Sequence, residues 1–406
     1  MFLRWVQLQF LLPTETAICA KQNASNIVAV KMSVLPRFNA IKQIISNQPR
    51  TSQKVRHVRK GNTMQYKFFG TSHGECLGGE IVGLPKNLIF STAEVERQLQ
   101  LRKCGYGRSN RQSCAEAVKW DLSELSNGKI SFQISDGCTE QRAEIAAYRP
   151  SHADLVGTKR YEGLSARQIS EIASARNSVC YVVLGAICKQ ILQKVGITTY
   201  SYTKQIGKIK CRAKFVLGKT DKAEYFAALR CPSKTATVRM QAEIDNMRAV
   251  GNSLGGVSVV VAHGVPMGIG EIVPYAARLD SQIAANLTGI PSVKGVEFGV
   301  GSTFASADGV SVCEKLHVNG GQICYQTNYN GGIIGGISTG ADIVCSLTVK
   351  PVPTVRGVKT IDANSLSEVD ALYERADTCV VPNVGTIAEN LLAAVLVEQM
   401  QKQNLL

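Results

Sequence analysis

Two segments of this chain are apolar on nearly every side, and they restrict the possible folds more than any other feature. Residues 179–195 and much of residues 387–397 would place apolar side chains all around a helix. A helix without a polar face must be covered on all sides, so it lies between other layers of structure. Neither segment reaches the ~18 consecutive apolar residues of a membrane-spanning helix. The chain therefore requires a layered domain with helices inside it.

Strand-forming segments separate these helices. Short apolar runs predict strands at residues 257–262, 296–300 and 343–349. Leu279, Ile283 and Leu287 recur every four residues and predict an amphipathic helix. Residues 64–406 contain no linker, so the pattern predicts one domain of mixed α and β structure.

Two helix starts are marked by a serine followed three residues later by a glutamate, which is the pattern of an N-terminal capping box. The pairs are Ser91 with Glu94 and Ser365 with Glu368. Each pair predicts a helix that begins directly after its serine.

The positive charge of the chain is unevenly distributed. The net charge is +15, and residues 1–63 contain ten Lys or Arg residues but one acid, Glu15, so they carry +9 and the rest carries +6. The modest charge of +6 on residues 64–406 suits a small polyanionic substrate better than nucleic acid. The basic, acid-poor leader has the composition of an organellar transit peptide, and an extended or disordered N-terminus explains it equally well. We therefore expect a plastid or another organelle if the leader is a transit peptide, and the cytoplasm otherwise.

The 13 cysteines form no C-x-x-C pair and no repeated spacing. They fall within apolar runs. The sequence therefore predicts reduced core thiols, with neither a metal site nor a disulfide framework.

Two histidines lie in loops that can project side chains into a cleft. His73 follows Gly70-Thr71-Ser72, and His152 follows Arg149-Pro150-Ser151. Imidazole titrates near neutral pH, so either residue can donate or accept a proton there. On spacing alone, a hydrogen-bonded turn histidine is the simpler interpretation of each.

Two further segments have residues suited to anions. Residues 102–111 combine glycines with Arg102, Arg108 and Arg111, and guanidinium groups grip phosphate and carboxylate bidentately. Residues 174–178 place hydroxyls, backbone donors and Arg176 at a helix N-terminus, where an anion is favoured. A solvated basic turn and ordinary helix capping are the alternatives, although capping does not explain Arg176.

Glycine is dense in two loops. They span residues 251–256 and 328–340, and the second is followed by Lys350-Pro351-Val352-Pro353-Thr354. Such backbones can approach flat or phosphorylated ligands closely. Neither loop has the spacing G-x-G-x-x-G or G-x-x-x-x-G-K-[ST], and each taken singly is explained by tight turns.

The order of these motifs resembles that of the chorismate synthase family over essentially all of residues 64–406. The family's motifs include G-E-S-H-G, G-Y-G-R-x-x-R, R-P-G-H-A-D, S-A-R-E-T and K-P-x-P-T. Similar segments stand at residues 70–74, 105–111, 149–154, 174–178, 252–256, 293–299, 328–340, 350–354 and 375–382. Each motif is weak, but nine in one order are highly specific. We therefore predict a leader at residues 1–63 and a chorismate synthase-like domain at residues 64–406.

The resemblance implies a fold, an assembly and a reaction. The fold is an α/β (α+β) sandwich in which buried helices lie between two largely antiparallel sheets, and the assembly is a homotetramer. The reaction is that of a carbon–oxygen lyase of the shikimate pathway for aromatic amino acids. It removes phosphate and a ring hydrogen from 5-enolpyruvylshikimate 3-phosphate by anti-1,4 elimination to give chorismate. Reduced FMN is required, and the expected partner is this small phosphorylated substrate, with no nucleic acid and no membrane.

The resemblance also assigns roles to individual residues. His73 protonates the leaving phosphate, His152 lies against the flavin's pyrimidine ring, and Asp377 assists proton removal at the flavin's central nitrogen. Substrate binding falls to Arg102, Arg108, Arg111 and Arg375. Cofactor binding falls to Ser174, Ala175, Arg176, Asn252, Gly336, Lys350 and Thr354.

Four positions depart from the family pattern. Thr71 and Asn177 replace glutamate, Ser178 replaces threonine, and Asn252 replaces aspartate. Lost carboxylates can misalign Arg176 or the flavin. One alternative is therefore a catalytically impaired paralogue that keeps a flavin or anion pocket as a binding or structural subunit. A nucleic-acid-binding protein is suggested only by charge, most of which lies in the leader.

Overall fold

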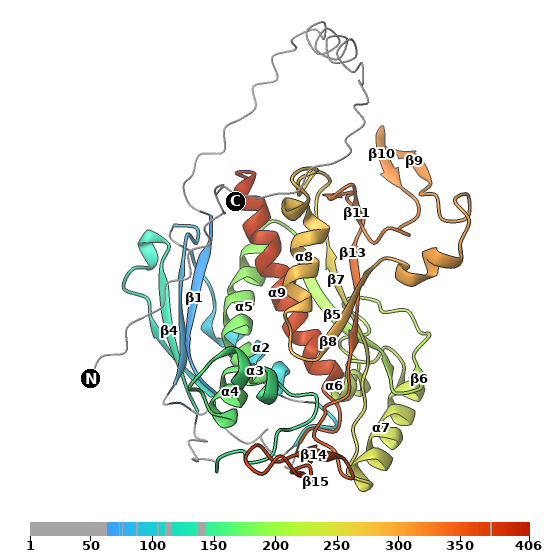
Figure 1. The fold of residues 1–406 in the computed structure, drawn as a ribbon. Helices are drawn as coiled ribbons and strands as arrows, with labels where there is room; N and C mark the ends of the chain where they lie inside the picture. Colours follow the sequence, from blue (N-terminus) through green and yellow to red (C-terminus); the bar gives the residue numbers. More distant parts are fainter. Residues whose placement is uncertain are drawn as a thin grey trace, which may run out of the picture. The chain divides into compact units, whose positions relative to one another are not determined.

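The computed structural model describes residues 63–406 except for residues 73, 75, 87, 104, 110–115, 137–142 and 374–375. In this part of the chain, helices lie between two antiparallel sheets (Figure 1). The predicted fold class is thereby confirmed. The predicted leader lies outside the described residues, except for Thr63 at its end.

The first sheet has four strands in the order β1-β2-β4-β3, and all neighbours are antiparallel. The strands are β1 (Gln65–Gly70), β2 (Leu77–Val82), β3 (Glu116–Asp121) and β4 (Ile130–Asp136). Ile81, Ile130 and Phe132 are fully buried on this sheet. β1 leads into the loop that contains Ser72 and Gly74.

The second sheet has five strands in the order β6-β5-β7-β13-β8, again antiparallel. They are β5 (Thr198–Ile206), β6 (Ile209–Lys210), β7 (Gly256–His263), β8 (Val293–Phe298) and β13 (Ile343–Val349). The three predicted strands correspond to β7, β8 and β13, although β8 begins three residues before the predicted run. β7 and β13 occupy interior positions in this sheet.

Helices α5 (Ser178–Gln193) and α9 (Val381–Lys402) fill the space between the sheets (Figure 1). A Cβ atom on Gly185 of α5 would lie 2.3 Å from the Asn390 carbonyl oxygen of α9, so glycine is needed for these helices to cross this closely. A Cβ atom on Gly385 would lie 2.5 Å from Ser258 Oγ of β7. α9 therefore packs on the five-stranded sheet, whereas the thiol of Cys180 on α5 donates to the Gly78 carbonyl oxygen of the four-stranded sheet.

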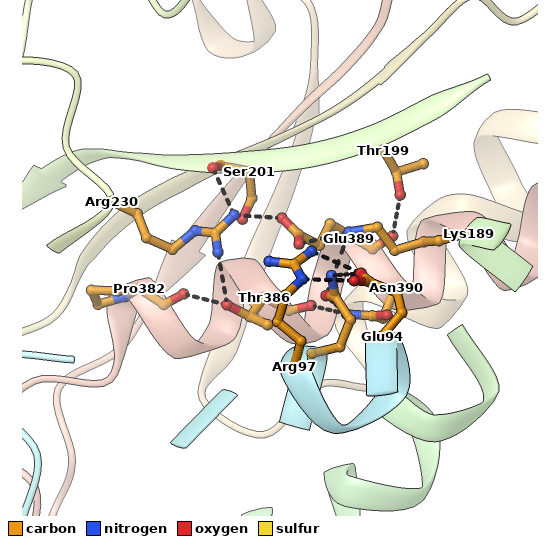
Figure 2. A network of polar contacts seen from close by, with 11 residues as sticks. Glu94, Arg97, Lys189, Thr199, Ser201, Arg230, Pro382, Thr386, Glu389 and Asn390 are labelled. Carbon is orange, nitrogen blue, oxygen red and sulfur yellow. Dashed lines mark hydrogen bonds and ion pairs between the residues drawn. The ribbon is translucent and has the colours of Figure 1, made fainter. Parts of the chain in front are cut away.

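Polar groups are also enclosed in this helical layer (Figure 2). Glu389 of α9 is 2% exposed and lies 2.8 Å from Lys189 Nζ and 2.7 Å from Arg230 Nη2. Burial alone would raise the pKa of Glu389, but the charges of Arg230 and Lys189 hold it below its ordinary value. We call Lys189, Arg230 and Glu389 the buried ionic cluster.

The remaining helices and short strands complete the described fold. The helices are α2 (Thr92–Lys103), α3 (Asp154–Arg160), α4 (Ala166–Ile172), α6 (Glu224–Leu229), α7 (Lys234–Ala249) and α8 (Leu279–Thr288). The short strands are β9 (Leu316–Asn319), β10 (Gln322–Tyr325), β11 (Ile333–Ile334), β12 (Ile337–Ser338), β14 (Lys359–Ile361) and β15 (Glu368–Asp370). The predicted amphipathic helix is α8, which buries Leu279, Ile283 and Leu287.

The two predicted helix starts have different outcomes. Ser91 Oγ accepts the Glu94 N–H at 3.3 Å, and α2 begins at the next residue. The helix predicted after Ser365 is wrong. There the Asp362 carboxylate accepts the backbone N–H groups of Asn364 and Ser365, which forms a turn, and β15 follows.

The described cysteines all have free thiols, and most are buried as predicted, although Cys313 is exposed. Among residues 63–406 as described, no helix combines the length and the apolar character needed to cross a membrane.

Candidate active site

The glycine-rich turn after α2 meets the segment that precedes α9. Arg108 Nη1 lies 2.5 Å from Asp377 Oδ2, and the Ser109 N–H donates to Asp377 Oδ1 at 2.7 Å. The Thr378 N–H donates to the Gly107 carbonyl oxygen at 2.8 Å. These contacts join two predicted site residues that are 269 positions apart in the sequence.

A cavity of about 400 Å³ lies beside this ion pair. Four predicted site residues share it, namely Arg108, Asn252, Thr354 and Asp377. Its other described lining residues are Ser109, Arg248, Tyr373, Ala376 and Thr378. Ligand pockets typically measure about 300–1,000 Å³, so the space suits a small molecule.

The His152 loop reaches the same cavity through Thr354. His152 Nε2 lies 3.4 Å from Thr354 Oγ1, and His152 Nδ1 lies 3.1 Å from the Pro150 carbonyl oxygen. A carbonyl can only accept, so Nδ1 carries the hydrogen and Nε2 accepts from the threonine hydroxyl. Burial, together with the charge of Arg149, lowers the pKa of His152. The imidazole is therefore neutral at neutral pH.

Two contacts fix this loop. Arg149 forms a bidentate ion pair with Asp154, which is fully buried, at 2.8 and 2.9 Å. Lys350 Nζ donates to the Ser151 carbonyl oxygen at 2.9 Å. Ser151 itself has φ of 60°, a left-handed conformation that L-residues adopt at a cost. The contacts of Arg149 and Lys350 thus hold a strained backbone that presents His152.

The segment at residues 174–178 lies against the Ser72 loop. Arg176 Nη1 donates to the Ser72 carbonyl oxygen at 2.5 Å. Ser174 Oγ accepts the Arg176 N–H, and Ser178 Oγ donates to the Ala175 carbonyl oxygen, so the serines cap and close the short turn before α5. The structure therefore brings Arg176 next to the residue that precedes His73 in the chain.

Arg102 and Gly336, like Ser174, Ala175 and Arg176, are not among the described residues that line the cavity. Arg102 has a side chain 7% exposed, and its Nη2 lies 2.5 Å from Glu116 Oε1, whose side chain is 8% exposed. Gly336 accepts the Leu279 N–H in the turn between β11 and β12. His73, Arg111 and Arg375 fall outside the described residues.

Comparisons with known proteins identify the family of this chain. A family model described as chorismate synthase matches residues 64–401. The chain belongs to the chorismate synthase family. A chorismate synthase of Caldicellulosiruptor bescii is 33% identical over 356 residues, which cover 82% of this chain and 93% of that protein. A chorismate synthase of Desulforudis audaxviator is 34% identical over 352 residues, covering 81% and 90%.

A solved structure titled as a crystal structure of chorismate synthase matches with a TM-score of 0.66 and 27% identity. The match covers 84% of this chain and 92% of that one. These comparisons confirm the predicted family, fold and enzyme class, which is that of a lyase. The predicted roles of individual residues, and the division at residue 63, stay predictions.

Asn177 and Asn252, two of the four departures from the chorismate synthase pattern, have defined hydrogen bonds, and Ser151 is a fifth departure. Asn177 Nδ2 donates to the Ile172 carbonyl oxygen at the end of α4. Asn252 lines the cavity, where its Oδ1 accepts the Ser253 N–H. Ser151 takes the place of the glycine in the family's R-P-G-H-A-D motif, which explains its left-handed backbone. The changes at 177 and 252 replace carboxylates by amides that still accept or donate hydrogen bonds.

One charged residue of the cavity, Arg248, belongs to none of the sequence motifs. Arg248 lies in the last turn of α7, four residues before Asn252. α7 buries Ala236, Met240 and Ile244, which recur every four residues. This period was a usable signal for the helix, and hence for the position of Arg248 next to the glycine-rich loop.

Proposed function

We propose that the protein catalyses the chorismate synthase reaction, with 5-enolpyruvylshikimate 3-phosphate bound in the cavity beside Arg108 and Asp377. The carbon–oxygen bond to phosphate and one ring carbon–hydrogen bond break, and chorismate and inorganic phosphate form. The observation that carries the proposal is the sharing of one cavity of about 400 Å³ by Arg108, Asn252, Thr354 and Asp377. These residues come from four motifs that are distant in the sequence.

The charges of the cavity suit an anionic substrate. The Arg108 side chain is 19% exposed, so it is accessible to a ligand yet shielded from much of the solvent. Guanidinium groups pair strongly with phosphate and carboxylate in such surroundings. On the family pattern, Arg111 and Arg375 would also bind the substrate. Arg102 is already enclosed with Glu116, so it would act by holding the start of the turn.

The described residues also suit reduced FMN. Around the cavity they offer the amide of Asn252 and the hydroxyls of Thr354 and Thr378, with a neutral imidazole behind Thr354. Asn252, Lys350 and Thr354 would hold the cofactor, with Ser174, Ala175, Arg176 and Gly336 as the other predicted contacts. When bound, reduced FMN would supply transient electron donation, and the reaction would have no net redox change.

The protein's own residues would move the protons and hold the charges. A leaving phosphate needs a proton and positive charge where negative charge develops, which we assign to His73 and Arg108. Asp377, held by Arg108 and by the Ser109 N–H, would assist proton removal at the central nitrogen of the bound flavin. His152, neutral and fixed by Pro150 and Thr354, would orient the bound ring system rather than carry charge.

An anaerobic assay tests the proposal. The full-length protein is mixed with reduced FMN and 5-enolpyruvylshikimate 3-phosphate, and phosphate and chorismate are measured together. We expect equal amounts of both products, formed far more slowly by a His73→Ala, His152→Ala double variant. FMN binding without release of phosphate would instead favour the impaired paralogue, which the amides at 177 and 252 and the threonine at 71 suggest.

The assembly and the leader complete the proposal. A homotetramer is expected by analogy with the family, and sedimentation of the purified protein measures it. A transit peptide in residues 1–63 predicts that the mature protein begins near residue 64, which N-terminal sequencing of the native protein measures.

A further inference from the structure

Two neighbouring cavities share the same pair of arginines. The cavity described above and a second one of about 340 Å³ are both lined by Arg108 and Arg248. The second is otherwise lined by Gly105, Tyr106, Gly107, Ala227 and Ala228. Arg248 therefore stands beside the predicted substrate-binding arginine although no family motif assigns it a role.

The two arginines have different partners. Arg108 is paired with Asp377, which lines the larger cavity with it. Arg248 Nη1 lies 2.9 Å from Asp245 Oδ1, and Asp245 is not among the described lining residues. The side chains of that pair are 48% and 47% exposed, and exposed pairs of this kind contribute about 0–1 kcal/mol. An anionic ligand can therefore engage Arg248 at little cost to the fold.

The charges along the larger cavity also favour an anion. Among its described lining residues, Arg108 and Asp377 offset each other, which leaves the charge of Arg248. Position 252 carries an amide where the family pattern has a carboxylate, so no second acid there opposes that charge. Two guanidinium groups thus face one carboxylate in the described lining, and Asp245 contacts Arg248 from outside it.

The surroundings of Arg248 hold it toward the glycine-rich turn. Its guanidinium carbon lies 5.5 Å from the centroid of the Tyr106 ring. The Tyr106 hydroxyl donates to Asp245 Oδ2 at 2.5 Å, and the Tyr106 N–H donates to the Ala228 carbonyl oxygen. Tyr106 and Asp245 thus orient the guanidinium group from two sides.

We propose that Arg248 is a substrate-binding residue that holds one anionic group of the substrate, phosphate or carboxylate, near Arg108. This inference rests on the proposed function. It gives Arg248 the substrate-binding role that the family resemblance implied for Arg102, whose side chain is enclosed with Glu116.

Binding and kinetics of Arg248→Ala test the inference. We expect the dissociation constant and KM for 5-enolpyruvylshikimate 3-phosphate to rise by about 10- to 100-fold, which is the loss of one hydrogen-bonded charge, with little change in kcat. Arg248→Lys should recover part of the affinity, because lysine keeps the charge but not the planar fork. Arg239→Ala, an exposed arginine earlier on α7, is the matched control and should bind as the wild type does.

Asp245→Ala separates ligand binding from packing. It removes the ion pair but leaves the guanidinium group, so affinity should fall much less than in Arg248→Ala. Equal losses in the two variants would show that Arg248 only supports Tyr106 and would overturn the inference. Titration with inorganic phosphate identifies the group held: weakened binding of both ligands in Arg248→Ala assigns phosphate, and weakened binding of the substrate alone assigns a carboxylate.

Different experimental outcomes would contradict the role of Arg248 and the proposed activity. If the wild type binds the substrate without turning it over and Arg248→Ala weakens that binding, the inference stands and the proposed activity is lost. If the wild type is active and Arg248→Ala keeps its dissociation constant and KM, the proposed activity stands and the inference is overturned.

Discussion

The buried ionic cluster and the Arg108–Asp377 pair both join opposite charges from distant segments, yet they differ in their surroundings. Glu389 is 2% exposed and meets two cations, and the side chains of Lys189 and Arg230 are 9% and 14% exposed. Arg108 and Asp377 are each 19% exposed and border a cavity of about 400 Å³. Enclosed charges with fixed partners contribute to the fold, whereas charges beside open space are available to a ligand.

This difference predicts that stability depends mainly on the first region and activity mainly on the second. Glu389→Ala leaves two buried cations without their carboxylate, so we expect a loss of about 3–5 kcal/mol in the free energy of unfolding. Urea denaturation measures it. Glu398→Ala on the same helix breaks the more exposed pair with Lys402 and should cost about 1 kcal/mol or less. Similar losses of unfolding free energy in both variants would contradict a special contribution of the buried ionic cluster to stability.

Asp377→Asn is the reciprocal test in the cavity. Asparagine keeps an oxygen for the Ser109 N–H but loses the charge and the proton-accepting group, so kcat should fall by about 10²- to 10⁴-fold. The free energy of unfolding should change far less than in Glu389→Ala. Asp370→Asn, at an exposed pair with Lys359, is the control and should keep wild-type turnover. Wild-type kcat in Asp377→Asn would contradict the assigned role.

The lowered pKa of His152 gives a pH-dependent prediction. In the unfolded chain this imidazole binds a proton near its ordinary pKa of about 6.5, whereas in the fold it stays neutral to lower pH. The unfolded state therefore binds more protons below pH 6.5, and stability should fall as the pH drops through that value toward the folded pKa. His152→Gln should flatten the slope of unfolding free energy against pH in this window. Identical slopes would mean that His152 is not buried in neutral form.

Ser151→Gly should give the smallest effect and the opposite sign. It relieves a left-handed backbone at φ of 60°, so we expect a gain of about 1 kcal/mol or less in unfolding free energy. Ser302→Gly, at an exposed position without positive φ, should not stabilise the protein. Thermal unfolding compares the two variants, and destabilisation by Ser151→Gly would show that the loop is not strained.

The sequence predicted the fold best where apolar periodicity was strong. α5, α8 and α9 carry long apolar patterns, and β7 and β13 are mainly apolar runs. These apolar patterns alone were enough to predict the five elements. The serine pattern failed at Ser365 because Asp362 binds the same backbone N–H groups in a turn. α7 was missed because its polar surface obscures a narrow apolar stripe.

The site was predictable only in part. Motif order placed Arg108, Asn252, Thr354 and Asp377 in one site, and they share a cavity. The enclosure of Arg102 by Glu116 depends on a strand pairing that no local pattern encodes. Arg248 lies outside every motif, and only the packing of α7 brings it to the cavity.

A crystal structure of the protein with FMN and 5-enolpyruvylshikimate 3-phosphate tests the central claim most directly. We predict that both ligands lie in the cavity bordered by Arg108, Asn252, Thr354 and Asp377, with an anionic group of the substrate within hydrogen-bonding distance of Arg108. Ligands bound at another place, with only water in this cavity, would contradict the account.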